Sequence, residues 1–231
     1  MSAIGTAIPS PQPNPRLLLR LLVAFAAVFI WSAIRPHDYF TWSAIRPHDY
    51  FTWFLETFPA VLALIVLAAT WRKWPLTPLV YILIFVHVVI LCVGGHYTYA
   101  EVPLFNWIRD VTEGARNNYD KVGHFAQGFV PAMVAREILL RRTPLREERW
   151  VFFLVTCVCL AVSAVYELFE WAVAIVTGSS AEAFLGTQGF QWDTQTDMFM
   201  ALIGAIGAQV LLSRLHDRQL GRGPNGDESN W

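Results

Sequence analysis

Charged residues are scarce in this sequence, and the shortage is concentrated in long uncharged runs. Asp, Glu, Lys and Arg make up 15% of the 231 residues, against about 25% in an ordinary soluble domain, whereas hydrophobic residues make up 55%. The formal net charge is only -1, so the composition gives no reason to expect nucleic acid as a partner. These absences exclude an ordinary soluble domain and are typical of a polytopic membrane protein.

Cysteine is also rare. Cys92, Cys157 and Cys159 all lie within apolar runs. The last two are two residues apart and would point in different directions on a helix. Small apolar packing residues explain them better than a metal site, and no disulfide framework is expected.

Six segments are long and apolar enough to cross a bilayer, which takes about 20 residues per helix. They are residues 17–34, 54–71, 76–95, 121–141, 150–176 and 195–213. The fourth is the least apolar, with its polar residues towards its two ends. We therefore predict an all-α fold, a polytopic membrane helical bundle with six transmembrane helices.

The distribution of Lys and Arg predicts the direction of these spans. With the N-terminus in the cytoplasm, twelve of the 17 basic residues fall on the inner side. Both termini are then cytoplasmic, and the protein is expected to cross the membrane several times. The predicted organisation is a disordered cytoplasmic tail at 1–16, a membrane domain at 17–213 and a second cytoplasmic tail at 214–231.

One segment is duplicated. WSAIRPHDYFT occupies residues 31–41 and again 42–52, within the first predicted outer loop. A solenoid needs at least three stacked units, so two copies do not make one. We interpret the extra copy, residues 31–41, as a duplication that the loop tolerates or as an assembly error in the sequence.

Polar residues gather in four stretches that the predicted topology brings to the same outer leaflet. These are GHYTYAEVP (95–103), NNYDKVGHFAQGF (117–129), YELFEW (166–171) and GTQGFQWDTQTDMF (186–199). Asp120 and His124 are four residues apart and share a helix face. Ionisable groups at membrane depth are costly, so they usually pair or bind something.

This convergence predicts a site with carboxylate and imidazole chemistry. The candidate catalytic residues are Asp120, His124, Glu167, Glu170 and Asp197. Asp120, His124, Glu170 and Asp197 are also the candidate ligands of a divalent metal ion that would activate water. A metal-free alternative uses Glu and His as general base and acid. The candidate substrate-binding residues are His96, Tyr97, Tyr99, Glu101, Tyr119, Gln127, Gln188, Asp193 and Gln195.

The sequence is compatible with three functions. The first is an enzyme acting on a lipid or lipid-linked envelope molecule. The second is a structural or accessory membrane protein, in which Lys121, Arg109 and Arg116 neutralise the carboxylates. The third is a transporter or ion-binding protein, which should carry polar residues near the bilayer midplane and an internal repeat of spans. Neither feature is evident in the sequence.

The first three polar stretches, together with FLGTQGFQWDTQTDMFMALIGA (184–205), resemble the YjdF family of bacterial inner-membrane proteins. That family has no known reaction, so the resemblance implies a multi-pass protein of the bacterial inner membrane and no chemistry. A weaker resemblance is to VanZ-like membrane proteins, whose DKxxHF pattern is matched by Asp120, Lys121, His124 and Phe125. This second resemblance implies a role in the cell envelope.

Overall fold

The computed structural model describes residues 11, 14–34, 50–178, 182–185 and 187–222. Every regular element within these ranges is helical. The elements are α1 (Pro15–Ala33), α2 (Tyr50–Thr70), α3 (Pro78–Tyr97), η1 (Tyr99–Glu101), α4 (Pro103–Val111), α5 (Tyr119–Arg142), α6 (Glu148–Thr177), α7 (Glu182–Leu185) and α8 (Asp193–Gln219). Most of the duplicated segment and of the two tails lies outside the described residues.

The six long helices correspond to the six predicted spans. Among the described residues, α1, α2, α3, α6 and α8 are long and apolar enough to cross a membrane. The polar residues of α5 keep it outside that group. The first and last helices extend further towards the chain ends than the predicted spans: α1 begins at Pro15 and α8 continues to Gln219. The short elements η1, α4 and α7 were not predicted.

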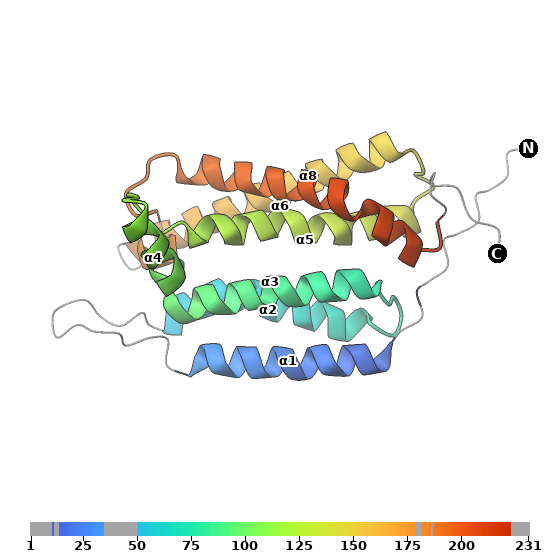
Figure 1. Cartoon of the computed structure of the whole chain (residues 1–231), viewed down its shortest axis with the longest axis horizontal. Helices are drawn as coiled ribbons and strands as arrows, with labels where there is room; N and C mark the ends of the chain where they lie inside the picture. The colour runs from blue at the N-terminus through green and yellow to red at the C-terminus, as the bar shows by residue number, and fades with distance from the viewer. Residues whose placement is uncertain (1–10, 12–13, 35–49, 179–181, 186, 223–231) are drawn as a thin grey trace, which may run out of the picture.

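The long helices run antiparallel, side by side, so that α1 begins and α8 ends at the same end of the bundle (Figure 1). Helices α1 and α2 both pack on α3, and α6 and α8 both pack on α5. Contacts between α3 and α5 join these two groups. The most extensive contact is between α5 and α8, which places the least apolar long helix in the interior of the bundle.

Prolines and an asparagine determine where several helices start. Pro15, Pro78 and Pro103 each stand in the first turn, where the missing N–H leaves no hydrogen bond unmade. The Asn14 side chain accepts a hydrogen bond from the Leu17 amide at 3.1 Å and caps α1. Helix α6 ends just before Gly178, whose φ of 60° is a conformation that glycine adopts more readily than other residues.

Helices α5 and α8 approach closely because glycines lie between them. Gly128 on α5 faces the backbone of Ala201, and Gly204 on α8 faces the backbone of Phe125. A Cβ at either glycine would overlap a carbonyl oxygen of the other helix. Small residues that allow backbones to meet are typical of helix packing within membranes.

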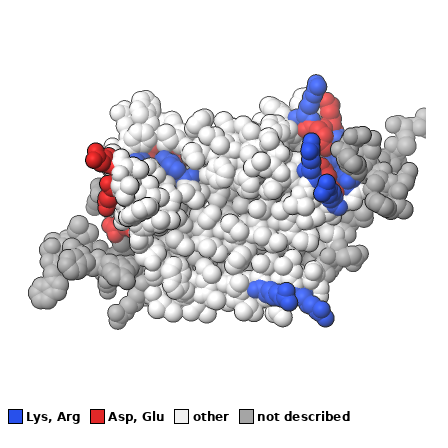
Figure 2. Space-filling view, viewed as in Figure 1, with Lys and Arg blue, Asp and Glu red and all other residues white. Residues whose placement is uncertain are grey.

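Charged residues lie at the two ends of the bundle and leave a broad uncharged band between them (Figure 2). Lys and Arg gather at the end where α1 begins, which we call the basic end. Large apolar side chains cover the band, with Leu19, Val165 and Val210 all more than 60% exposed. Soluble proteins rarely expose so broad an apolar surface to water, which indicates that lipid surrounds the band.

A buried network of polar side chains joins α3, α5 and α8 at the basic end. It consists of Thr77, Arg136, Glu137, Arg141, His216, Asp217 and Arg222. Glu137 and His216 are completely buried, and His216 Nε2 donates to Glu137 Oε2 at 3.1 Å. Arg136 donates to His216 Nδ1, which requires the proton of a neutral imidazole to reside on Nε2. The network therefore fixes the positions of three helix ends.

Candidate functional site

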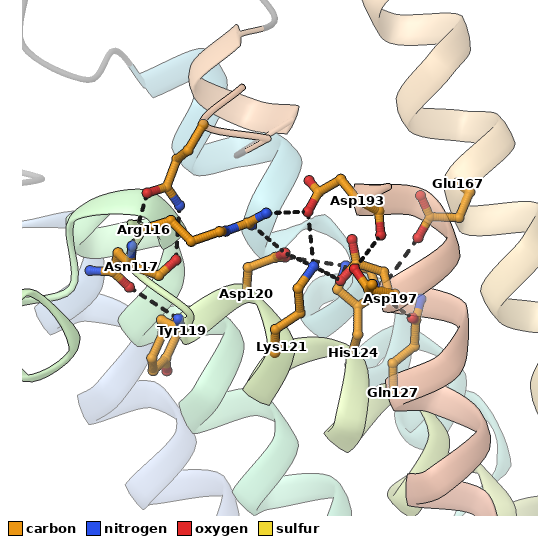
Figure 3. Close-up of polar contacts among 12 residues, drawn as sticks. Arg116, Asn117, Tyr119, Asp120, Lys121, His124, Gln127, Glu167, Asp193 and Asp197 are labelled. Atoms are coloured by element: carbon orange, nitrogen blue, oxygen red, sulfur yellow. Dashed lines mark hydrogen bonds and ion pairs between the residues drawn. The ribbon is translucent and has the colours of Figure 1, made fainter. Parts of the chain in front are cut away.

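At the opposite end of the bundle, a polar cluster connects α5, α6 and α8. We define it as Arg116, Asp120, Lys121, His124, Glu167, Asp193 and Asp197. Asp120 and His124 are one turn apart on α5, and Asp193 and Asp197 are one turn apart on α8 (Figure 3). The two pairs face each other because the glycine contact one to two turns deeper holds these helices close together.

Two cations bind the three aspartates of the cluster. Lys121 Nζ lies 2.5 Å from Asp197 Oδ1, 2.8 Å from Asp193 Oδ1 and 3.3 Å from Asp120 Oδ2. The guanidinium of Arg116 donates to Asp193 at 2.6 Å and lies 3.5 Å from Asp120. The aspartate side chains are 10% exposed or less. Buried charges are stable only when they are paired in this way.

The imidazole of His124 lies at the centre of the cluster and is 7% exposed. Its Nε2 lies 3.2 Å from Asp120 Oδ1 and 3.9 Å from Asp197 Oδ1. Its Nδ1 lies 3.0 Å from Gln127 Oε1 and 3.7 Å from Glu167 Oε1. Oxygen acceptors therefore face both ring nitrogens and fix the plane of the ring. A histidine oriented by a carboxylate in this manner is suited to proton transfer.

Three of the four predicted metal ligands come together. One ligand atom each from Asp120, His124 and Asp197 can be chosen so that all three lie within 4.8 Å of one another. Glu170 is not part of this group. The ammonium of Lys121 already contacts both aspartates, so a metal ion would compete with a lysine for the same oxygens.

Beside the cluster, a cavity of about 660 Å³ runs along the bundle between α2, α3, α5 and α6. Its polar wall contains Glu56, Tyr99, Asp120, His124, Gln127, Tyr166 and Glu170. Towards the basic end the lining becomes apolar, with Leu62 and Val66 of α2, Val134 and Ile138 of α5, and Val162 of α6. Phe184 of α7 lines it between α2 and α6. The cavity is therefore amphipathic along its length.

Several predicted substrate-binding residues lie away from the cluster. His96 stacks on Trp31 with ring centroids 4.3 Å apart, and its Nδ1 faces Ser32 O at 3.3 Å. Tyr97 packs edge-on against the same tryptophan. These two residues contact α1 and not the cluster, because that face of the α3 end is turned towards α1.

Glu101 and Gln195 are exposed. Gln195 lies between Asp193 and Asp197 on α8, and two residues of separation turn it to the opposite side of the helix. Gln188 has a structural contact instead: its amide pairs with the backbone N–H and C=O of Asn117 at 2.9 and 2.8 Å. This pairing holds the segment before α5 against the segment before α8.

The two tyrosines near the cluster pack against each other. Tyr119 and Tyr99 have ring centroids 5.5 Å apart, and the Tyr119 hydroxyl donates to Ile90 O at 2.9 Å. Tyr99 fits where Gly94 and Gly123 leave no side chain in its way. Tyr119 is thus a packing residue, whereas Tyr99 also lines the cavity.

The predicted site omits three residues that the structure brings to it. Lys121 and Arg116 were considered only as neutralising charges, and they do bind the aspartates, whereas Arg109 pairs with Asp110 at the surface. Glu56 lies in an otherwise apolar predicted span. An isolated ionisable residue in a span is a recognisable signal of a functional position.

The helical bundle, its lipid-facing belt and the buried cluster at one end define a polytopic helical membrane protein with an amphipathic cavity. The family model described as "Predicted membrane protein (DUF2238)" matches residues 17–218. The chain is 53% identical over 209 residues to the inner membrane protein YjdF of Escherichia coli (strain K12), covering 90% of this chain and 95% of that protein. The chain therefore belongs to the DUF2238 family and is an inner-membrane protein. No solved structure matches it, and the resemblance to VanZ-like proteins gains no support from these matches.

Proposed function

We propose that this protein acts on a lipid or lipid-linked envelope molecule at the outer leaflet of the inner membrane. One observation carries the proposal: the cavity passes directly from the buried Asp120–His124 pair to an apolar lining at membrane depth. A lipid bound there would have its chain among the apolar residues and its polar part beside the imidazole. Pockets of this size with a few polar groups at one end are typical binding sites.

The topology belongs to the same proposal. Helix α5 runs through the interior of the bundle between α3 and α8, which supports its assignment as the fourth of six spans (Figure 1). The concentration of Lys and Arg at the basic end favours a cytoplasmic position for that end and for both termini (Figure 2). The polar cluster then faces the outer leaflet.

The chemical role follows from the contacts of His124. Asp120 holds the ring, so that His124 would give a proton to the leaving group and then regain one from the attacking water or hydroxyl group. Glu170 lines the cavity and would contact the substrate. Asp193, Asp197, Lys121 and Arg116 hold α5 and α8 in register around this pair.

Replacement of His124 by alanine is expected to remove this activity. Acid–base groups contribute about 10² to 10⁴ in rate, so the variant should behave as a deletion in a cell. Lipid extracts are compared by mass spectrometry between a deletion strain and strains that carry the wild type or the variant. Gln195→Ala is the control because it changes an exposed residue at the same end.

We expect the wild type and Gln195→Ala to restore the lipid profile, and His124→Ala, present at the same level in the membrane, to leave it as in the deletion. Full restoration by His124→Ala would exclude the proposed chemistry. Degradation of His124→Ala, together with full restoration by the milder Asp120→Asn, would assign a structural role to the cluster.

Binding of a divalent cation is a second candidate, favoured by the grouping of Asp120, His124 and Asp197. Carboxylate and imidazole ligands suit ions such as Mn²⁺ or Zn²⁺. Because Lys121 occupies the same carboxylates, we expect Lys121→Met to bind Mn²⁺ more tightly than the wild type and Asp120→Asn to bind it less tightly. Metal content after equilibrium dialysis against Mn²⁺ measures this order. Equal content in the three proteins would exclude the site.

A further inference from the structure

A glutamate on α2 is buried beside the cavity and is only partly satisfied. Glu56 is 1% exposed, and its Oε1 accepts a hydrogen bond from the Thr98 hydroxyl at 3.2 Å. The backbone amide of Tyr99 also donates to this carboxyl group. Its second oxygen, Oε2, has no hydrogen-bond partner in the part of the chain that the structure describes. Since Glu56 lines the cavity, a bound molecule can supply the missing donor.

A second glutamate lines the cavity from another helix. Glu170 on α6 has neither a hydrogen bond nor an ion pair with the described residues, whereas Glu167, one turn earlier, faces His124. The phenol of Tyr166 lies near enough to interact electrostatically with both Glu56 and Glu170. The polar end of the cavity therefore carries two carboxyl groups, one on α2 and one on α6, that make no salt bridge with a described Lys or Arg; His124 interacts with Glu170 electrostatically from a longer distance.

The Lys and Arg side chains nearest the cavity are already paired with aspartates. No Lys or Arg is among the described residues that line the cavity. Lys121 pairs with Asp120, Asp193 and Asp197, and Arg116 pairs with Asp120 and Asp193. Carboxyl oxygens are poor partners for a phosphate group, whereas an ammonium group beside Glu56 and Glu170 would favour their ionised form and find hydrogen-bond acceptors.

We propose that Glu56 and Glu170 bind the primary ammonium group of an amine-bearing lipid whose chain occupies the apolar length of the cavity. A primary ammonium carries three N–H donors, which is enough for the free oxygen of Glu56, for Glu170 and for the Tyr166 hydroxyl. The pairing also relieves the cost of burying carboxyl groups in a membrane protein. This inference rests on the proposed function, because it requires that a lipid enters the cavity.

The test measures head-group preference with single-chain amphiphiles of equal chain length. The heads are a primary ammonium, a trimethylammonium, a glucoside and a phosphate. Each competes for the full-length protein in detergent against a probe with an uncharged hydroxyl head and a fluorophore on its chain. We expect the primary ammonium to displace the probe at a concentration about ten-fold below those of the other three, as a charge-assisted hydrogen bond requires. The trimethylammonium head carries the same positive charge but no N–H donor, so its competition measures the contribution of charge without hydrogen-bond donation.

Two variants test the residues themselves. Glu56→Gln and Glu170→Gln should each raise the concentration of primary ammonium needed by about ten-fold, since a charged acceptor is lost. Glu113→Gln is the matched control, because Glu113 is exposed at the same end of the bundle. Unchanged competition in both cavity variants would overturn the assignment of the ammonium site.

The head-group series on the wild type distinguishes two kinds of failure. Equal competition by all four amphiphiles, or strongest competition by the phosphate, would overturn the ammonium inference and leave the cavity as a lipid site. Absence of any saturable probe binding would remove the lipid site, and the proposed function with it.

Discussion

Glu137→Ala is expected to destabilise the protein by about 3–5 kcal/mol, the usual penalty for removing one partner of a buried ion pair. Glu137 is completely buried and accepts hydrogen bonds from the Thr77 hydroxyl at 2.8 Å, Arg141 at 2.6 Å and His216 at 3.1 Å. Its loss would deprive the Arg141 guanidinium of its carboxylate and leave Nε2 of the buried His216 ring without its acceptor. The contacts between α3, α5 and α8 at the basic end would weaken together. Thermal unfolding of the detergent-purified protein measures the effect.

Glu147→Ala is the control for this substitution. Glu147 lies at the same end of the molecule and is exposed. The variant should change the free energy of unfolding by no more than about 0.5 kcal/mol in either direction, as is usual for surface substitutions. Its melting temperature should therefore stay close to that of the wild type. Equal melting temperatures for Glu137→Ala and the wild type would show that the buried network does not stabilise the fold.

Gly204→Ala is expected to disrupt the contact between α5 and α8. The added Cβ would overlap the carbonyl oxygen of Phe125, and a backbone atom cannot move aside as a flexible side chain can. Overpacking costs about 1–3 kcal/mol or more, whereas alanine gains only about 1 kcal/mol in helix propensity over glycine. The overlap should therefore dominate, with a lower melting temperature and a smaller yield of folded protein.

Gly207→Ala, on the same helix, is the matched control for the glycine contact. The nearest atoms to a Cβ at Gly207 belong to the Phe129 ring at 4.0 Å, an ordinary contact distance. Only the gain in helix propensity remains, so this variant should be as stable as the wild type or more stable by up to about 1 kcal/mol. If both alanine variants were equally stable, the close approach of α5 and α8 would not be required.

The long helices could be predicted because each leaves a strong local signal. The predicted span at 76–95 corresponds to α3 (Pro78–Tyr97), and the least apolar span at 121–141 corresponds to α5 (Tyr119–Arg142). Length and hydrophobicity are properties of a segment alone. By contrast, α7 (Glu182–Leu185) has too few residues to show a period, and it was not predicted.

The composition of the site could be predicted only in part. Asp120 and His124 share a helix face by their spacing, and the structure places Asp197 across from them. His96 belongs to a stretch that reaches the same end of the bundle, yet its ring stacks on Trp31 of α1. The sequence indicated which stretches reach the same end of the bundle, whereas it did not indicate the direction of each side chain.

The sequence by itself determined that the chain is a helical membrane protein, where its long helices lie and which stretches carry the polar cluster. Tertiary structure decided which of those residues face one another. The reason is that lipid-facing and protein-facing sides of a membrane helix are both apolar, so hydrophobicity does not indicate how a helix is rotated. That rotation is set by contacts between helices, such as Gly128 and Gly204 between α5 and α8. The same contacts turn Asp197 towards His124, and packing of α2 on α3 turns Glu56 to the cavity.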